Sequence, residues 1–204
     1  METIDSILEN VQKEVELYGR SGSNCVFKDN LQFSIKAKNF VPPLNSHIDE
    51  AVSDVNWFLQ CASKGYVVSH PNPDVSFWIR YFGRDALPYG STWNFTALKE
   101  NLLDEDSWRR ALLFNHQHPT APPCVVCYQY QVVDYGTLDC TVTLRSSDVV
   151  NVLPQDVLMS RLILDYVCSL IGYEPGKMTF NLANAHVYYQ DMEYPDEHVI
   201  DYGD

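Results

Sequence analysis

Basic residues are scarce in this sequence, which has 14 Lys and Arg against 27 Asp and Glu and a formal net charge of −13. Non-specific nucleic-acid binding and docking on an anionic membrane both need a basic surface, so this balance argues against both functions. No apolar run approaches the roughly 18 residues of a membrane-spanning helix. The first 19 residues are too rich in charge for a secretory signal peptide. We therefore expect a cytoplasmic protein.

The sequence also lacks the regular cysteine spacing of a small disulfide-stabilised protein. Its six cysteines are Cys25, Cys61, Cys124, Cys127, Cys140 and Cys168. In a chain of 204 residues they favour free thiols in a reducing compartment. Cys124 and Cys127 form a C-x-x-C motif, but no second pair completes a zinc site, and alternation along a strand would place them on opposite faces. The sequence therefore predicts neither a metal site nor a redox pair.

Length and apolar patterning predict one domain that spans residues 1–204. Helices are predicted over residues 2–18, 47–59, 95–103 and 157–171, the last of which is apolar on most sides and is expected to be the buried central helix. Strands are predicted over residues 25–27, 31–37, 111–115, 124–133, 137–145, 178–183 and 185–189, with a hairpin turn at residues 134–136. We expect residues 65–88 to be irregular and residues 193–204 to form an acidic surface tail. Strands and helices that do not alternate strictly favour an α+β fold.

The few arginines lie in contexts that suit a phosphate dianion. Arg20 lies in a turn of Ser and Gly, Arg109 and Arg110 are adjacent, and Arg145 precedes Ser146. A guanidinium with neighbouring hydroxyl groups is a good phosphate receptor. For any one of these arginines, a solvated surface position is the alternative. Arg145 is the exception, because it ends an apolar strand and a second apolar pair follows, so we expect it to be partly buried.

Cys124 is the candidate nucleophile. It follows two prolines and opens a predicted strand. A core position is the alternative, since free cysteines are commonly buried. A thiol near an arginine cluster, however, is shifted toward the reactive thiolate.

Eight short motifs follow one another along residues 18–192. They are Arg20-Ser-Gly-Ser, Trp57-Phe58-Leu59, Tyr89-Gly90-x-x-Trp93, Ser107-x-Arg109-Arg110, Pro123-Cys124-x4-Gln129, Arg145-Ser146-Ser147-Asp148, Leu153-Pro154-Gln155-Asp156 and His186-Val187-Tyr188. Each motif alone is weak evidence, but eight in the same order make a chance similarity improbable. Through them the chain resembles the thymidylate synthase family.

The resemblance implies an α+β fold whose large mixed sheet forms the interface of a homodimer. It implies that Arg20, Arg145 and Ser146 bind the phosphate of the nucleotide in their own subunit. Arg109 and Arg110 would reach the phosphate in the partner's site. Local clustering of cations then outweighs the acidic net charge, because charges beyond a Debye length of about 8 Å are screened.

The family's activity implies covalent catalysis at Cys124. The thiolate would add to C6 of a pyrimidine nucleoside monophosphate, which makes C5 nucleophilic toward the one-carbon unit of 5,10-methylenetetrahydrofolate. A base then removes the C5 proton. The resulting exocyclic methylene takes up hydride to give a methyl group, or water to give a hydroxymethyl group.

Asp156 departs from the family's synthases, which carry asparagine eight residues after the aspartate of the R-S-x-D motif. A carboxyl group accepts from the cytosine amino group and, when protonated, donates to N3, whereas an amide suits uracil. An unpaired polar group would penalise the wrong base by ~1–3 kcal/mol. The resemblance is closest to the deoxycytidylate hydroxymethylase branch, found in bacteriophages that replace cytosine in their DNA, which carries the same Asp. The alternative is a first-turn acid that interacts with the dipole of the following helix.

Two further departures concern the handling of protons and water. Asp54 stands where the family has its catalytic glutamate, and its side chain is one methylene shorter. It could still order water and relay protons, through a bridging water; a solvent-facing helical acid is the alternative. Val125 stands where synthases usually carry His, as in the hydroxymethylase branch. Residues 193–204 offer no counterpart of the tail that closes the synthases' site, which favours water addition over hydride transfer.

The resemblance assigns further residues on the nucleotide side. Tyr89 would join a hydroxyl network near the C5 proton. Gln129 would support the nucleophile strand and the base. His186 and Tyr188 would bind the 3′-hydroxyl of the deoxyribose.

On the folate side, Asp148 would lie near the pterin. Trp78 would stack on the folate, with an ordinary core or surface aromatic as the alternative. Asn181 and Asn184 are candidates for contacts to the base or the folate.

Three functions remain open on the sequence alone. The first is a deoxycytidylate 5-hydroxymethylase that uses 5,10-methylenetetrahydrofolate. The second is an enzyme that forms a methyl group on dCMP or dUMP with the same scaffold. The third is a catalytically inactive relative that binds nucleotide, which the short chain and Asp54 allow and which Cys124 and the set of arginines oppose.

Overall fold

A mixed β-sheet is the centre of the computed structural model, which describes residues 3–83, 88–115, 123–134 and 136–193. The strands are β1 (Arg20–Ser21), β2 (Cys25–Lys36), β3 (Leu112–Phe114), β4 (Val125–Asp134), β5 (Thr137–Leu144), β6 (Ser147–Asp148) and β7 (Glu174–Tyr188). Their order is β1-β2-β7-β5-β4-β3, and β6 pairs with β7. Both β5 and β6 run parallel to β7, whereas the other pairs are antiparallel. The predicted α+β class is confirmed.

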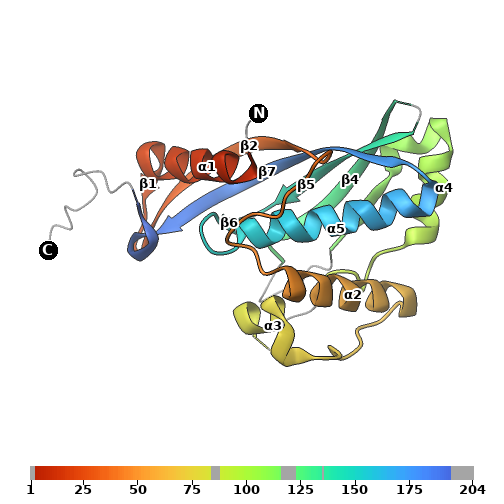
Figure 1. Cartoon of the computed structure of the whole chain (residues 1–204), viewed down its shortest axis with the longest axis horizontal. Helices are drawn as coiled ribbons and strands as arrows, with labels where there is room; N and C mark the ends of the chain where they lie inside the picture. Colours follow the sequence, from red (N-terminus) through yellow and green to blue (C-terminus); the bar gives the residue numbers. More distant parts are fainter. Residues whose placement is uncertain (1–2, 84–87, 116–122, 135, 194–204) are drawn as a thin grey trace, which may run out of the picture.

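Helices cover one face of this sheet in two layers (Figure 1). They are α1 (Ile4–Tyr18), α2 (Ile48–Lys64), α3 (Phe77–Phe82), α4 (Phe95–Leu103) and α5 (Leu153–Ile171), with 3-10 turns η1 (Pro73–Val75), η2 (Glu105–Arg110) and η3 (Tyr189–Asp191). Helix α1 packs on β2 and β7, and α5 packs on β5 and β7. Helix α2 packs on the other side of α5 and carries α3. No described helix has the length and apolar character to cross a bilayer.

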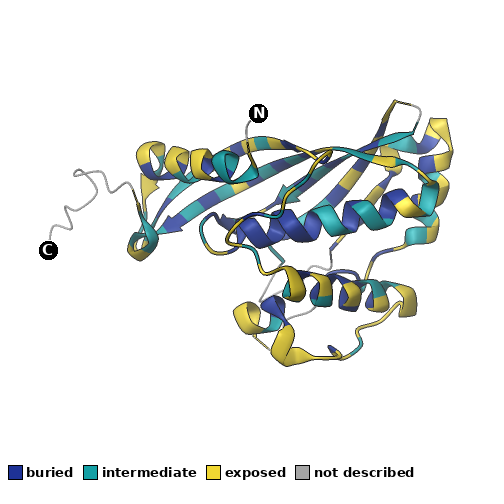
Figure 2. Cartoon of the chain, in the orientation of Figure 1, coloured by how far each residue is buried: buried dark blue, intermediate teal, exposed yellow. Residues whose placement is uncertain are grey.

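Helix α5 is the buried central helix that its apolar pattern predicts, and its N-terminal half is the most buried part (Figure 2). It begins at Leu153, four residues before the predicted start, because Pro154 is well suited to a first helical turn. It ends where predicted, at Gly172, whose φ of 74° lies in the left-handed region that favours glycine. The early start matters for function because it places Asp156 within the first turn.

Two expectations about the elements need correction, and a third lies outside the described residues. The two predicted strand pairs at residues 25–37 and 178–189 are single long strands, β2 and β7, and Asn30 interrupts the regular backbone of β2 with a φ of 56°. Residues 65–88 are not wholly irregular, because they contain η1 and α3. The predicted tail at residues 193–204 lies outside the described residues beyond Glu193.

The face of the sheet away from the helices carries uncharged polar side chains. Gln32 donates to Asn181 at 2.5 Å, and the Ser34 and Thr179 hydroxyls lie 3.0 Å apart. These pairs join β2 to β7 across the face opposite the buried residues Ile35 and Phe180. The sheet therefore has one apolar face under the helices and one face of hydrogen-bonding groups.

Candidate active site

Cys124 immediately precedes β4, and Arg145 immediately follows β5, its antiparallel neighbour. The register pairs Val125 with Leu144, so both residues lie at the open end of the hairpin. The Arg145 backbone N–H donates to the Cys124 carbonyl at 2.8 Å. Its Nε donates to the Pro123 carbonyl at 3.1 Å, and Nη2 lies 4.0 Å from the Cys124 Sγ. A cation is therefore fixed beside the candidate nucleophile.

The structure corrects two expectations about this pair. Arg145 is exposed rather than partly buried, because it lies beyond the last residue of β5 and crosses the loop at Pro123 on the rim of the site. Cys124 is not tipped toward the thiolate: its pKa is raised to about 11, first by burial and then by the charge of Asp156, which Arg145 only partly offsets. At neutral pH the thiol keeps its proton, so it must lose that proton before it can attack.

Asp156 lies in the first turn of α5 and is 5% exposed. The Ser147 hydroxyl donates to its Oδ2 at 3.4 Å. Burial raises its pKa to about 7, and its charge raises the pKa values of Cys124, Tyr89 and Tyr128. This carboxyl group is therefore directed into the site rather than solvated at the helix end, and at neutral pH it exists in both protonation states.

Tyr89 forms the inner wall behind Cys124. The Val125 N–H donates to its hydroxyl oxygen at 3.1 Å, and burial raises its pKa well above the ordinary value. Its ring lies 5.4 Å from that of Phe58 on α2. Gly90 permits this approach: it has a φ of 80°, and a Cβ there would overlap the Phe58 backbone. The aromatic motifs of the sequence thus meet behind the nucleophile.

A second group of polar residues gathers where β6 meets β7. The register pairs Asp148 with His186, and the Ser146 hydroxyl lies 3.3 Å from the His186 Nδ1. Burial lowers the pKa of His186, which favours the neutral ring. Burial, followed by the charges of Asp148 and Cys25, raises the pKa of Tyr188, and Cys124 contributes as well. The structure therefore brings Ser146, Asp148, His186 and Tyr188 to the site of Cys124.

Asp54 on α2 is fully buried, which excludes the solvent-facing alternative. The Ser76 hydroxyl donates to its Oδ1 at 2.5 Å, and the Trp78 N–H donates to its Oδ2 at 2.9 Å. Burial raises its pKa, and these hydrogen bonds oppose that shift. The carboxyl group therefore holds the N-terminal turn of α3 in place. Trp78 in turn connects it to Tyr89, because the centroids of the Trp78 and Tyr89 rings lie 4.2 Å apart.

Helix α3 carries the predicted candidate Trp78 and one site residue, Tyr81, that the sequence did not reveal. Trp78 is 4% exposed, and among the described residues its indole N–H has no hydrogen-bond partner. Tyr81, one turn further on, is 44% exposed and donates to the Asp148 Oδ2 at 3.2 Å. Tyr81 lies within residues 65–88, which the sequence predicts to be irregular. Ser76 ahead of an apolar run is the helix-start signal that indicates α3.

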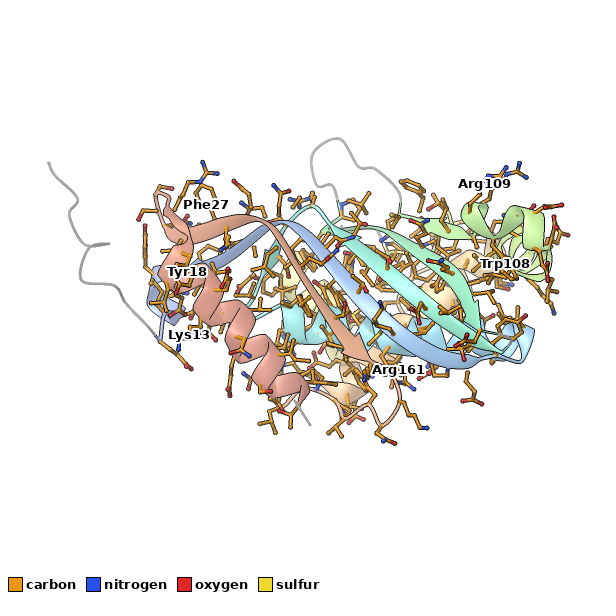
Figure 3. All side chains as sticks on the ribbon, turned by 90° about the horizontal axis from the view of Figure 1, so that it is seen from above. Lys13, Tyr18, Phe27, Trp108, Arg109 and Arg161 are labelled. Atoms are coloured by element: carbon orange, nitrogen blue, oxygen red, sulfur yellow. The ribbon has the colours of Figure 1, made fainter. Side chains whose placement is uncertain are left out.

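The remaining arginines lie apart in this chain. Arg20 on β1 is mostly exposed, forms an ion pair with Asp29, and covers the Phe27 ring at 5.0 Å. Arg109 and Arg110 are exposed on η2. Figure 3 places Phe27 and Arg109 toward opposite ends of the molecule. One chain therefore does not gather all four arginines around one phosphate.

Gln129 is not brought to the nucleophile. It is five residues along β4 from Cys124, which corresponds to about 16 Å of extended chain. Its exposed side chain belongs to the polar face of the sheet, as does that of Asn181, which is paired with Gln32. Asn184 pairs with Asp29 in the β2–β7 register. The expectation that Gln129 contacts a base held at Cys124 of its own chain is therefore wrong, although Gln129 does lie on the strand that follows the nucleophile.

The arrangement combines a thiol, an adjacent cation, a buried carboxyl that titrates near neutrality, and a phenol behind the nucleophile. Such a set suits nucleophilic addition to a polar heterocycle with proton transfer. Nearby, the exposed Tyr81 ring, held by its hydrogen bond to the buried Asp148 carboxyl group, offers a face on which a flat heterocycle, such as a pterin, can stack. Trp78 does not share this face: it is buried against the rings of Phe58 and Tyr89, so the expected stacking of Trp78 on the folate is corrected to a core position.

Comparisons with known proteins agree with this geometry. The sequence model of thymidylate synthase matches residues 1–200, and the chain belongs to the thymidylate synthase family. Thymidylate synthase 1/2 of Encephalitozoon cuniculi (strain GB-M1) is 35% identical over 72 residues. That match covers 35% of this chain and 24% of the relative, so the aligned part of the chain corresponds to about a quarter of the relative's length. Enzymes of this family use methylenetetrahydrofolate as co-substrate and are typically homodimers.

Proposed function

We propose that this chain transfers the one-carbon unit of 5,10-methylenetetrahydrofolate to C5 of dCMP and releases 5-hydroxymethyl-dCMP. Family membership supports the general reaction, which is one-carbon transfer to a pyrimidine nucleotide. The observation that carries the choice of cytosine is the buried carboxyl group of Asp156, which has a pKa of about 7 and lies close enough to raise the pKa of Cys124.

Asp156 would read the base through its protonated form. The carboxylic O–H donates to N3 of cytosine, and the second oxygen accepts from the N4 amino group. Uracil presents N3–H and O4 instead, so the same carboxyl group would face a donor where it donates and an acceptor where it accepts. Each mismatch leaves a buried group unpaired, which costs about 1–3 kcal/mol.

Cys124 would attack C6 once its proton has been removed. Arg145, with Nη2 4.0 Å from Sγ, would stabilise the thiolate and share a nucleotide phosphate with Ser146, and with Arg20 once Arg20 leaves its ion pair with Asp29. His186, whose Nδ1 lies 3.3 Å from the Ser146 hydroxyl, and Tyr188 would bind the 3′-hydroxyl. Arg109 and Arg110 of a second copy would complete the phosphate site, because in its own chain Arg109 lies toward the opposite end of the molecule from Phe27 and Arg110 follows it on η2 (Figure 3).

The co-substrate would lie on α3, where the exposed ring of Tyr81, held by its hydrogen bond to Asp148, offers a stacking face. When bound, methylenetetrahydrofolate supplies the carbon that C5 attacks. Asp54 and Tyr89 would order water and relay the C5 proton. The choice of water over hydride rests on the hydroxymethylase-like sequence at residues 145–150 and 186–188, and on Val125 in place of a histidine.

The reaction is tested by release of tritium from [5-³H]dCMP and [5-³H]dUMP in the presence of methylenetetrahydrofolate. We expect faster release from dCMP, and no release from either nucleotide by Cys124→Ala. Cys127→Ala, a second thiol on the same hairpin, serves as the matched control and should keep the wild-type rate. A folded dimer that releases no tritium from either nucleotide would contradict the proposal.

A further inference from the structure

His70 is a buried histidine in the segment between α2 and η1, and its side chain is 1% exposed. The Asn72 N–H donates to its Nδ1 at 3.0 Å. An Nδ1 that accepts a hydrogen bond carries no proton, so the proton of the neutral ring is on Nε2. Trp57 packs its ring edge-on at 4.9 Å and keeps the imidazole in this orientation.

The protonated nitrogen faces Asp54. Nε2 lies 3.3 Å from the Asp54 Oδ1 and 3.5 Å from the Ser53 hydroxyl. Ser76 and the Trp78 N–H approach the same carboxyl group from α3. Two donors from α3 and the His70 ring therefore surround this carboxyl group, and His70 is the neighbour that belongs to neither α2 nor α3.

We infer that His70 is a positioning residue that acts through Asp54, because its buried Nε2 lies 3.3 Å from the Asp54 Oδ1 and holds the carboxyl group in its orientation against α3. The inference rests on the proposed function, in which ionised Asp54 orders water and relays a proton. Nothing in the sequence motifs pointed to His70, which lies in the segment predicted to be irregular.

The other charges around Asp54 do not replace this contact. Glu50, one turn earlier on α2, raises the pKa of Asp54, whereas His70 lowers it. Arg80 of α3 is committed to Glu50 through two contacts of 2.6 Å. On the other elements packed against α2, Asp74 of η1 is exposed and Asp156 of α5 is itself an acid. Loss of His70 therefore leaves Asp54 harder to ionise.

The kinetic test compares the pH dependence of kcat/KM for the wild type, His70→Leu and His70→Gln. Because activity requires ionised Asp54, His70→Leu should move the acid limb upward by roughly one pH unit. In His70→Gln the amide nitrogen can take the place of Nε2, so the acid limb should lie close to its wild-type position. The matched control is His47→Leu, which replaces an exposed histidine at the start of α2, the helix that carries Asp54, and should leave the acid limb of the pH profile in place. A His70→Leu limb that coincides with the wild-type limb overturns the inference.

A second measurement works on the wild-type protein, without substrate, and covers the case in which His70→Leu does not fold. The ¹⁵N NMR signals of the His70 ring should report the Nε2–H tautomer, with His70→Gln used for assignment. The Nδ1–H tautomer would overturn the inference. The two failures stay distinct: absence of tritium release by the wild type contradicts the proposed function, whereas the ring tautomer tests the contact with Asp54 independently.

Discussion

Burial has the largest effect on the pKa values of Cys124 and Asp156. Cys124 and Asp156 both have raised pKa values because each is more stable without its charge in a buried environment. For Asp156 this protonated form is the one that matches cytosine. For Cys124 the protonated form is unreactive, so bound substrate and Arg145 must stabilise the thiolate that burial disfavours.

Asp156→Asn should transfer the preference of the enzyme from dCMP to dUMP. An amide that donates to O4 and accepts from N3–H pairs with uracil, and mispairing with cytosine at ~1–3 kcal/mol predicts a fall of roughly 5- to 150-fold in the ratio of kcat/KM for dCMP to kcat/KM for dUMP. Asp165→Asn, at a partly exposed position of the same helix where the side chain pairs with Arg161, is the control. A ratio unchanged in Asp156→Asn would remove the argument for base recognition.

The same residue sets the sign of a pH effect. With a pKa of about 7, Asp156 is protonated below that pH and ionised above it. The affinity of the wild type for dCMP should therefore fall as pH rises above about 7, by up to tenfold per pH unit. Asp156→Asn should lack this limb, which titration calorimetry across pH would show directly.

The adjacency of Cys124 and Arg145 could be predicted from the sequence, because the antiparallel hairpin predicted on either side of residues 134–136 brings Val125 opposite Leu144. The pKa of Cys124 could not, since the sequence does not reveal that Asp156 faces the thiol or how deeply both are buried. His70 and Tyr81 were missed for a similar reason. Their contacts join residues that are distant in the sequence, and only tertiary packing places them together.

At the scale of the elements, α3 depends on a cap that is shared between two helices. Ser76 is its N-cap: the hydroxyl oxygen accepts from the Ile79 N–H and the hydroxyl donates to Asp54 on α2. Long periodic helices such as α5 were predictable because their apolar pattern persists for several turns. The short α3 was not, because a helix of six residues has too few positions to show a period.

Ser76→Ala should destabilise the protein more than the loss of an ordinary helix cap. It removes the cap of α3 and one hydrogen bond of a buried carboxyl group, which together cost about 2–3 kcal/mol. Asn94→Ala, which removes the cap of α4 at an exposed position, should cost about 1 kcal/mol and is the comparison. Urea unfolding measures both changes. Equal losses in the two variants would contradict a supporting role for Asp54 beneath α3.

At the scale of the molecule, the proposed site needs two chains. The polar face of the sheet, with Gln32 and Asn181 paired across it, is the face that a second copy would cover in the homodimer typical of the family. Such an interface would carry Arg109 and Arg110 from one copy toward the nucleotide of the other. The acidic net charge then coexists with a local cluster of cations.

Subunit complementation tests this arrangement. Cys124→Ala and the double variant Arg109→Glu, Arg110→Glu should each be inactive as homodimers. After unfolding and refolding together in equal amounts, half of the dimers are mixed and each mixed dimer has one intact site, so about a quarter of the wild-type activity should return. Recovery of no activity by mixed dimers would show that the arginines serve their own chain.

The identity of the nucleotide product tests the central claim most directly. The reaction is run with dCMP and methylenetetrahydrofolate in ¹⁸O-labelled water, and the nucleotide and folate products are identified by mass spectrometry. We predict 5-hydroxymethyl-dCMP that carries the label, together with tetrahydrofolate, and no product from Cys124→Ala. A 5-methyl nucleotide with dihydrofolate as co-product would contradict the proposed hydroxymethyl transfer.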